Sequence, residues 1–124
     1  MSKPDLELDY QIVKGVEVFL TVIVGNAQFG VTLAHLDGRK VAEGPQLITE
    51  TLGKGESLAG TLLVVRTAVA DVNPHTNRAI VTYQLTGGAV NVVEHSQKDA
   101  EEDGDIVPFK AVIHFKGGDG NENA

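Results

Sequence analysis

Val16–Val24, VEVFLTVIV, decides the fold of this chain because apolar side chains recur in it at every second residue. Successive side chains of an extended strand point to opposite faces, so Val18 and Leu20 share one face. The other face, which carries Phe19 and Ile23, is also largely apolar. A strand that is apolar on both faces is expected to be covered on both sides, either by loops of its own chain or by another subunit.

The same alternation recurs along the rest of the chain, and no segment has the pattern of a long helix. Short strands separated by frequent turn signals are typical of sandwiches and barrels. We therefore expect an all-β fold, an antiparallel two-sheet β-sandwich of immunoglobulin-like or jelly-roll type with Greek-key connections and eight to nine strands. The segments expected to form strands are Leu6–Val13, Val16–Val24, Phe29–Leu36, Arg39–Ala42, Gln46–Thr51, Thr61–Ala70, Arg78–Thr86, Ala89–His95 and Val107–Phe115.

Turn residues suggest how some of these strands connect. Asp37 and Gly38 tolerate a positive φ and predict a hairpin between their flanking strands. A polar connection rich in turn formers predicts a second hairpin, between Thr61–Ala70 and Arg78–Thr86. The stretch Glu94–Asp105 carries six acidic residues and one lysine, and we interpret it as a mobile loop.

Length and composition indicate one folded domain. The chain has 124 residues, of which 42% are hydrophobic and 22% charged, as in globular proteins. We expect a single sandwich domain over residues 1–116 and a disordered tail over 117–124, which is rich in glycine and asparagine.

The net charge and the lack of recognisable targeting signals limit the kinds of partner and the cellular location that we expect. The formal net charge of −7 disfavours contact with nucleic acid and with anionic membranes. The chain has no cysteine, and its sequence shows neither a secretory signal nor a membrane-spanning segment. These features predict a cytoplasmic protein that binds neither nucleic acid nor membrane.

No pattern of catalytic residues emerges from the sequence. The four histidines, His35, His75, His95 and His114, lack the short spacings of metal-ligand pairs. There is no cysteine, and no serine lies in a G-x-S-x-G turn. We therefore predict that the protein is not an enzyme and needs no cofactor.

Two polar loops suggest one possible cation site. Asp71, Asn73 and Asn77 alternate in the first loop, and Asp103 and Asp105 lie in the second, so their oxygens would suit calcium if the loops meet. The spacing does not match an EF-hand loop, which needs glycine at its sixth position and glutamate at its twelfth. Stabilisation of a turn by side-chain hydrogen bonds explains the residues of the first loop and is the favoured interpretation.

The surplus of apolar side chains carries the leading hypothesis about function. A strand of a monomeric sandwich needs only one buried face, so apolar residues on the second face indicate an interaction surface. We predict a non-enzymatic module that acts through protein contacts, with itself or within a larger assembly. The alternative is a module that binds calcium or a small ligand through the 71–77 and 96–105 loops. The residues expected to make the protein contacts are Phe19, Thr21, Ile23, Leu62 and Val64.

Overall fold

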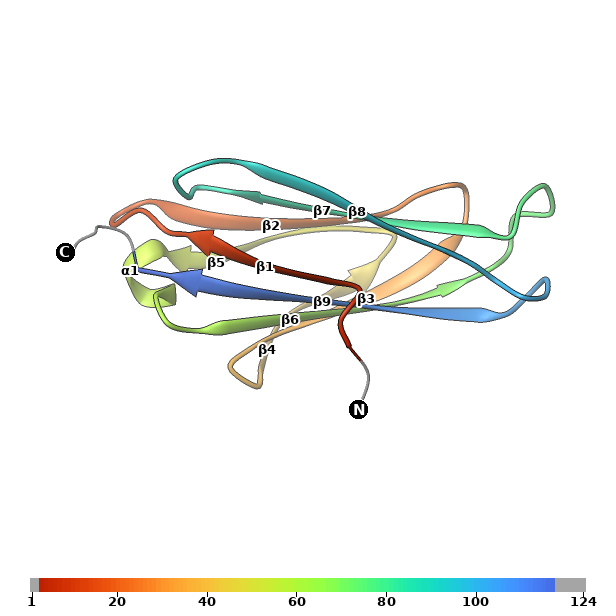
Figure 1. Cartoon of the computed structure of the whole chain (residues 1–124), viewed down its shortest axis with the longest axis horizontal. Helices are drawn as coiled ribbons and strands as arrows, with labels where there is room; N and C mark the ends of the chain where they lie inside the picture. Colours follow the sequence, from red (N-terminus) through yellow and green to blue (C-terminus); the bar gives the residue numbers. More distant parts are fainter. Residues whose placement is uncertain (1–2, 118–124) are drawn as a thin grey trace.

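Two layers of strands make up the structure, a computed structural model that describes residues 3–117 (Figure 1). The expected tail at 117–124 lies outside the described residues except for Gly117. The strands of the described part are β1 (Leu6–Gln11), β2 (Glu17–Val24), β3 (Phe29–Leu36), β4 (Arg39–Pro45), β5 (Leu47–Lys54), β6 (Leu62–Ala70), β7 (Arg78–Thr86), β8 (Val92–Asp99) and β9 (Ile106–Lys116), with one short helix, α1 (Gly55–Leu58).

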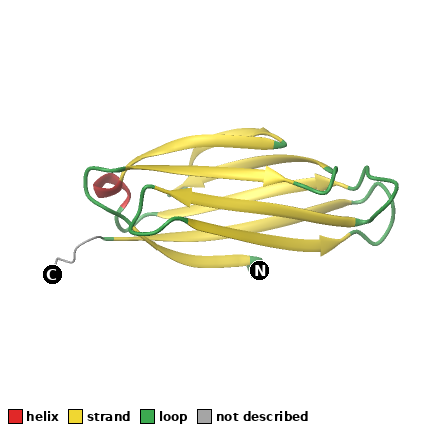
Figure 2. Cartoon of the chain, turned by 90° about the horizontal axis from the view of Figure 1, so that it is seen from above, coloured by secondary structure: helices red, strands yellow, loops and turns green. Residues whose placement is uncertain are grey.

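The strands form a five-stranded sheet in the order β1-β9-β6-β3-β4 and a four-stranded sheet in the order β5-β2-β7-β8. Figure 2 shows the two layers with their strands running in similar directions. Neighbouring strands are antiparallel except β1 and β9, which are parallel. The two-sheet β-sandwich expected from the alternation is therefore confirmed, with one parallel pair added to it.

One predicted hairpin is wrong. β6 lies between β3 and β9 in the five-stranded sheet, whereas β7 lies between β2 and β8 in the other sheet. The connection between β6 and β7 therefore crosses the roughly 10 Å that separates packed sheets. Alternation identifies the buried face of a strand but not the strands beside it in the sheet. Two strands that are consecutive in sequence and joined by a polar loop therefore resemble a hairpin, even where they belong to different sheets. The hairpin at Asp37 and Gly38 is present, and both residues have positive φ.

The acidic stretch Glu94–Asp105 is also more ordered than predicted. Its first half belongs to β8, which runs to Asp99, and Ser96 and Ala100 are buried. The strand expected over Ala89–His95 thus starts and ends later than predicted, because β8 lies at a sheet edge and its inward positions are mostly polar. Register places Glu94 opposite the buried Tyr83 and Lys98 opposite the buried Ala79.

The inner faces of both sheets supply the hydrophobic core. At one end Tyr10 packs edge-on against Phe115, with ring centroids 6.1 Å apart. Thr32 and Thr67 lie opposite each other on β3 and β6. Their buried hydroxyls form a hydrogen bond with each other at 2.8 Å. The largest fully buried side chains are Tyr10, Phe109, Phe115, Leu20, Leu58, Leu63, Leu85, Ile113, Gln28, Val18, Val22 and Val65.

The two tyrosines of the chain are both buried but differ in how their hydroxyls are satisfied. The Tyr10 hydroxyl donates to the carbonyl of Val90 at 2.8 Å and accepts from the N–H of Gly88 at 2.9 Å. The Tyr83 hydroxyl has no hydrogen-bond partner among residues 3–117. Burial raises the pKa of both hydroxyls; the negative charge of Asp5 raises the pKa of Tyr83 further, and the bond from Gly88 partly offsets the rise at Tyr10.

This difference predicts opposite consequences of removing each hydroxyl. Tyr10→Phe leaves the Gly88 N–H and the Val90 carbonyl without their partner, so it is expected to lower the free energy of unfolding by about 1–3 kcal/mol. Tyr83→Phe removes a buried hydroxyl that has no partner, so it is expected to be neutral or stabilising by up to about 1 kcal/mol. Urea unfolding of both variants tests this, and a larger loss for Tyr83→Phe than for Tyr10→Phe would contradict it.

Candidate functional site

The residues predicted to make protein contacts lie on opposite sides of the sandwich. Phe19, Thr21 and Ile23 alternate with buried residues of β2 and therefore face outward from the four-stranded sheet. Leu62 and Val64 face outward from β6 in the five-stranded sheet. The two groups are separated by the core, so the five residues cannot form a single contact surface.

The outer face of the four-stranded sheet mixes apolar side chains with hydroxyl groups. Phe19 lies between Thr51 and Thr86 on the neighbouring strands. Thr21 lies beside Thr49, and their hydroxyls are 3.2 Å apart. The apolar residues of β2 are thus separated by polar ones, as on a sheet face that water covers.

The outer face of the five-stranded sheet carries a more continuous apolar surface. Cross-strand register aligns Phe29, Ala70 and Ile106 in one row across β3, β6 and β9. The next row aligns Val31, Ala68 and Pro108. Neighbours within a row have Cβ atoms about 4.5–5.5 Å apart, so these side chains adjoin. We call these six residues the outer apolar patch: Phe29, Val31, Ala68, Ala70, Ile106 and Pro108.

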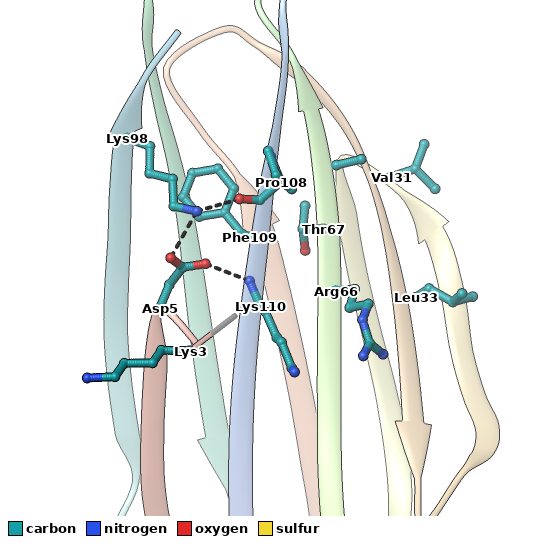
Figure 3. Close-up of a pocket in the computed structure, with 11 residues that line it drawn as sticks. Lys3, Asp5, Val31, Leu33, Arg66, Thr67, Lys98, Pro108, Phe109 and Lys110 are labelled. Atoms are coloured by element: carbon teal, nitrogen blue, oxygen red, sulfur yellow. Dashed lines mark hydrogen bonds and ion pairs between the residues drawn. The ribbon is translucent and has the colours of Figure 1, made fainter. Parts of the chain in front are cut away.

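The outer apolar patch is accessible in the described structure. Phe29 is 49% exposed, Val31 41% and Ile106 62%. A concavity of about 510 Å³ extends from the patch towards the N-terminal segment (Figure 3). Exposed apolar residues that adjoin one another are the usual mark of an interaction surface, whereas single ones are not. The residues that line the concavity are Lys3, Asp5, Val31, Leu33, Arg66, Thr67, Ala68, Lys98, Pro108, Phe109 and Lys110.

A pair of basic residues borders the outer apolar patch. Register places Arg66 of β6 directly opposite Lys110 of β9, on the same outward face, with Leu33 of β3 in the same row. Neither basic side chain makes an ion pair within residues 3–117. Like charges directly opposite each other on a sheet destabilise it, so this basic pair opposes folding rather than supporting it.

The nearby edge of the five-stranded sheet is closed to a further strand. β9 extends beyond the start of β1, and Pro108 in that exposed part has no N–H to offer. The ammonium of Lys98 caps the Pro108 carbonyl at 2.6 Å and pairs with Asp5 at 2.9 Å (Figure 3). Asp5 in turn accepts from the backbone N–H of Lys110 at 2.8 Å.

Both edges of the four-stranded sheet carry inward charges. Glu50 of β5 is opposite the fully buried Leu20, and Glu94 of β8 is opposite the buried Tyr83. An inward-pointing charge at an edge prevents another strand from pairing there without burying it. These two edges are therefore unsuited to contact by strand addition.

The two loops predicted to hold a cation do meet at one end of the sandwich. The backbone N–H of Asp71 donates to Asp105 at 2.9 Å, and that of Gly104 donates to Asp71 at 3.0 Å. The side-chain amide of Asn77 lies 2.9 Å from a carboxylate oxygen of Asp71 and 2.7 Å from one of Asp103. Both carboxylate oxygens are hydrogen-bond acceptors. The atom of the Asn77 amide that faces them is therefore its nitrogen, which is a donor.

The other two residues of the predicted cation site do not converge with these three. Asn73 uses its side-chain oxygen to accept from the N–H of His75 and its nitrogen to donate to Asn26. The Asp105 carboxylate accepts from the N–H of Glu102 at 3.0 Å. Among residues 3–117, no group of three or more histidine, cysteine, aspartate or glutamate residues is placed to hold a metal ion.

Sequence analysis missed the side chain that organises these loops. Gln28 is 1% exposed and lies between β2 and β3. Its amide nitrogen donates to the buried Asp71 carboxylate at 2.8 Å and to the carbonyls of Thr76 and Arg78. Its oxygen accepts from the N–H groups of Val72 and Asn73, at 2.7 and 2.8 Å. A single glutamine between two strands gives no periodic signal, so the sequence offered no reason to select it.

The histidines are dispersed. His35 faces outward from β3 opposite Val64, and Asp71 follows seven residues further along β6, roughly 20 Å away in an extended strand. His95 lies on the outer face of the other sheet, beside Thr82. His114 contacts Glu7 at 2.7 Å. The arrangement does not bring these groups into one shared site.

Comparison with known proteins adds no relatives. The chain matches no family model, no curated protein and no solved structure. Within residues 3–117, no helix has the length and apolar character that crossing a membrane requires.

The hydrogen bonds of Gln28 predict a large effect of its removal. Gln28→Leu leaves the buried Asp71 carboxylate and two backbone N–H groups without this partner, so it is expected to lower the free energy of unfolding by about 3 kcal/mol or more. Gln97→Leu is the matched control because Gln97 is exposed, and its effect is expected within about 0.5 kcal/mol. Equal unfolding midpoints in urea for the two variants would contradict the role given to Gln28.

Proposed function

We propose that this protein is a non-enzymatic module that acts through protein contacts, and that it makes them with the outer face of its five-stranded sheet. The observation that supports this proposal is the outer apolar patch, in which Phe29, Val31 and Ile106 are exposed in adjoining rows. The core is already complete without these side chains, because the inner residues of the same strands fill it. Their retention on the outer face is therefore best explained by a partner that covers them.

The edges at β5, at β8 and along the exposed part of β9 favour contact through a face over contact through an added strand. Pro108 with its Lys98 cap, together with Glu50 and Glu94, disfavours pairing with an added strand. The opposite face is the weaker choice, because threonines interrupt its apolar residues. The prediction that Phe19, Thr21 and Ile23 make contacts is tested by the same experiment. The other two residues of that prediction, Leu62 and Val64, face outward on the same sheet as the outer apolar patch.

Photocrosslinking tests which face is used. Phe29 and Phe19 are matched, because both are phenylalanines and are 49% and 41% exposed on opposite faces. Each is replaced in turn by the photoreactive analogue p-benzoylphenylalanine in cells that naturally make the protein. Irradiation is expected to give an adduct of discrete mass from position 29 and none from position 19. An added Ile106→Asp change is expected to abolish the adduct, because it places a charge in the outer apolar patch.

Two outcomes would count against the proposal. An adduct from position 19 alone would move the contact to the four-stranded sheet, and the absence of adducts from both positions would remove the contact surface. An adduct of twice the 13.1 kDa mass of the chain would identify the partner as a second copy.

A second candidate function is cation binding at the meeting point of the two polar loops. The observation that favours it is the convergence of oxygen-bearing side chains from Asp71, Asn77 and Asp103. The amide of Asn77 would have to turn its oxygen towards the ion, because calcium binds oxygen ligands.

Calcium titration tests this candidate. If the loops bind calcium, a concentration about one hundred times the Kd is expected to stabilise the fold by about 2.7 kcal/mol and to raise the Tm. Asp103→Asn is expected to abolish the shift, whereas Glu101→Gln, an exposed control in the same loop, is expected to preserve it. The absence of both binding heat and a Tm shift would eliminate the candidate.

A further inference from the structure

We infer that the partner of the five-stranded sheet is an acidic protein segment, one that places a carboxylate over Arg66 and Lys110 and apolar side chains over the outer apolar patch. This inference rests on the proposed function and specifies the chemistry of the partner. The basic pair and the patch lie on the same outward face, in consecutive rows of β3, β6 and β9.

The charge of the basic pair points to an anion. Arg66 and Lys110 repel each other across the two strands, and neither makes an ion pair among the described residues. The chain carries 17 acidic residues, so the missing counter-charge does not reflect a shortage of acids. A carboxylate bound between the two side chains relieves their repulsion and makes charge-assisted hydrogen bonds with both.

The spacing of the rows determines the pattern of the segment. Successive outward residues of a strand are about 6.6–6.8 Å apart, so the row of Arg66, the row of Ala68 and the row of Ala70 follow at that interval. An extended peptide repeats its side chains on one face at the same interval. The matching segment therefore has an acidic residue followed, or preceded, by apolar residues two and four positions away.

A second copy of the chain is the less suitable occupant. Two copies that met symmetrically through this face would bring two basic pairs towards each other. The net charge of −7 on each copy adds a longer-range repulsion. A different protein with an acidic and apolar segment brings no second basic pair, and it avoids the longer-range repulsion where its overall charge is not strongly negative.

Peptide titration of the full chain, followed by 15N NMR chemical shifts, tests the inference. The probes are acetylated and amidated peptides with the core Asp-Ser-Leu-Ser-Phe or its reverse, and counterparts with lysine in place of aspartate. An acidic probe is expected to shift the amides around Val31, Ala68 and Pro108 and to bind about tenfold or more tightly than its lysine counterpart. Binding is expected to weaken as NaCl is raised to 1 M, because salt screens exposed charges.

Charge variants supply the controls. Arg66→Glu is expected to lower the affinity for the acidic probe about tenfold or more and to raise the Tm of the free protein, because it turns a like-charge pair into an opposite-charge pair. Arg66→Gln is expected to lower the affinity by removing the charge alone. Lys54→Glu makes the same change in net charge on the other sheet and is expected to leave the affinity unchanged.

Several results would overturn the inference. The lysine peptides could bind as tightly as the acidic peptides or more tightly. The protein could show no preference between the two kinds of peptide at 1 mM. Arg66→Glu could leave the affinity for the acidic peptide unchanged. Saturable binding of sodium decanoate at the same amides, without binding of the acidic peptides, would assign the surface to a small amphiphile instead. If crosslinking at position 29 succeeds while the peptides show no preference, the contact surface stands and only the acidic partner is rejected.

Discussion

The pleat of β6 is the constraint on which the rest of the structure depends. Leu63, Val65 and Val69 point inward and are fully buried, so every intervening side chain must point away from the core. Val64 and Ala68 therefore cannot contribute to the core, although they are as apolar as their neighbours. Because β6 is central in its sheet, the strands on both sides continue its outer surface, and the apolar character of that surface belongs to the sheet rather than to one strand.

The position of the outer apolar patch depends on a polar network at the same end of the sandwich. Gln28 immediately precedes Phe29, the first residue of β3, and binds the loop that follows β6 through Asp71. The same loop is tied to the segment before β9 by backbone hydrogen bonds of Asp71 with Asp105 and with Gly104. The ends of the three patch-bearing strands are thus held together by hydrogen bonds in a buried setting, where a missing partner is costly. A preorganised surface loses less conformational entropy on binding than a mobile one, which favours affinity.

Sequence alone predicted the local fold well and the spatial arrangement poorly. The bounds of β2, β3 and β7 lie within one residue of the expected segments, because period-2 alternation is a local property of the chain. The pairing of β6 with β3 and β9, rather than with β7, depends on contacts across the whole sheet, which no local pattern contains. Alternation placed Leu62 and Val64 on the second face of their strand, but the rows of Phe29 and Ile106 on that face required the register between strands. The cation hypothesis required its two loops to meet, and they do, but side-chain contacts join only Asp71, Asn77 and Asp103 among its five residues.

The charges of the molecule act at two different distances. At long range the net charge of −7 opposes the approach of further copies and of anionic polymers. At short range Arg66 and Lys110 give that surface a local positive charge, so an acidic partner is attracted only where it also meets apolar side chains. In the proposed complex, affinity would derive mainly from apolar burial and selectivity from the basic pair, whose like charges destabilise the unbound sheet. A stable sandwich can discriminate between partners in this way, because only a partner with a suitably placed carboxylate removes the repulsion that destabilises the free protein.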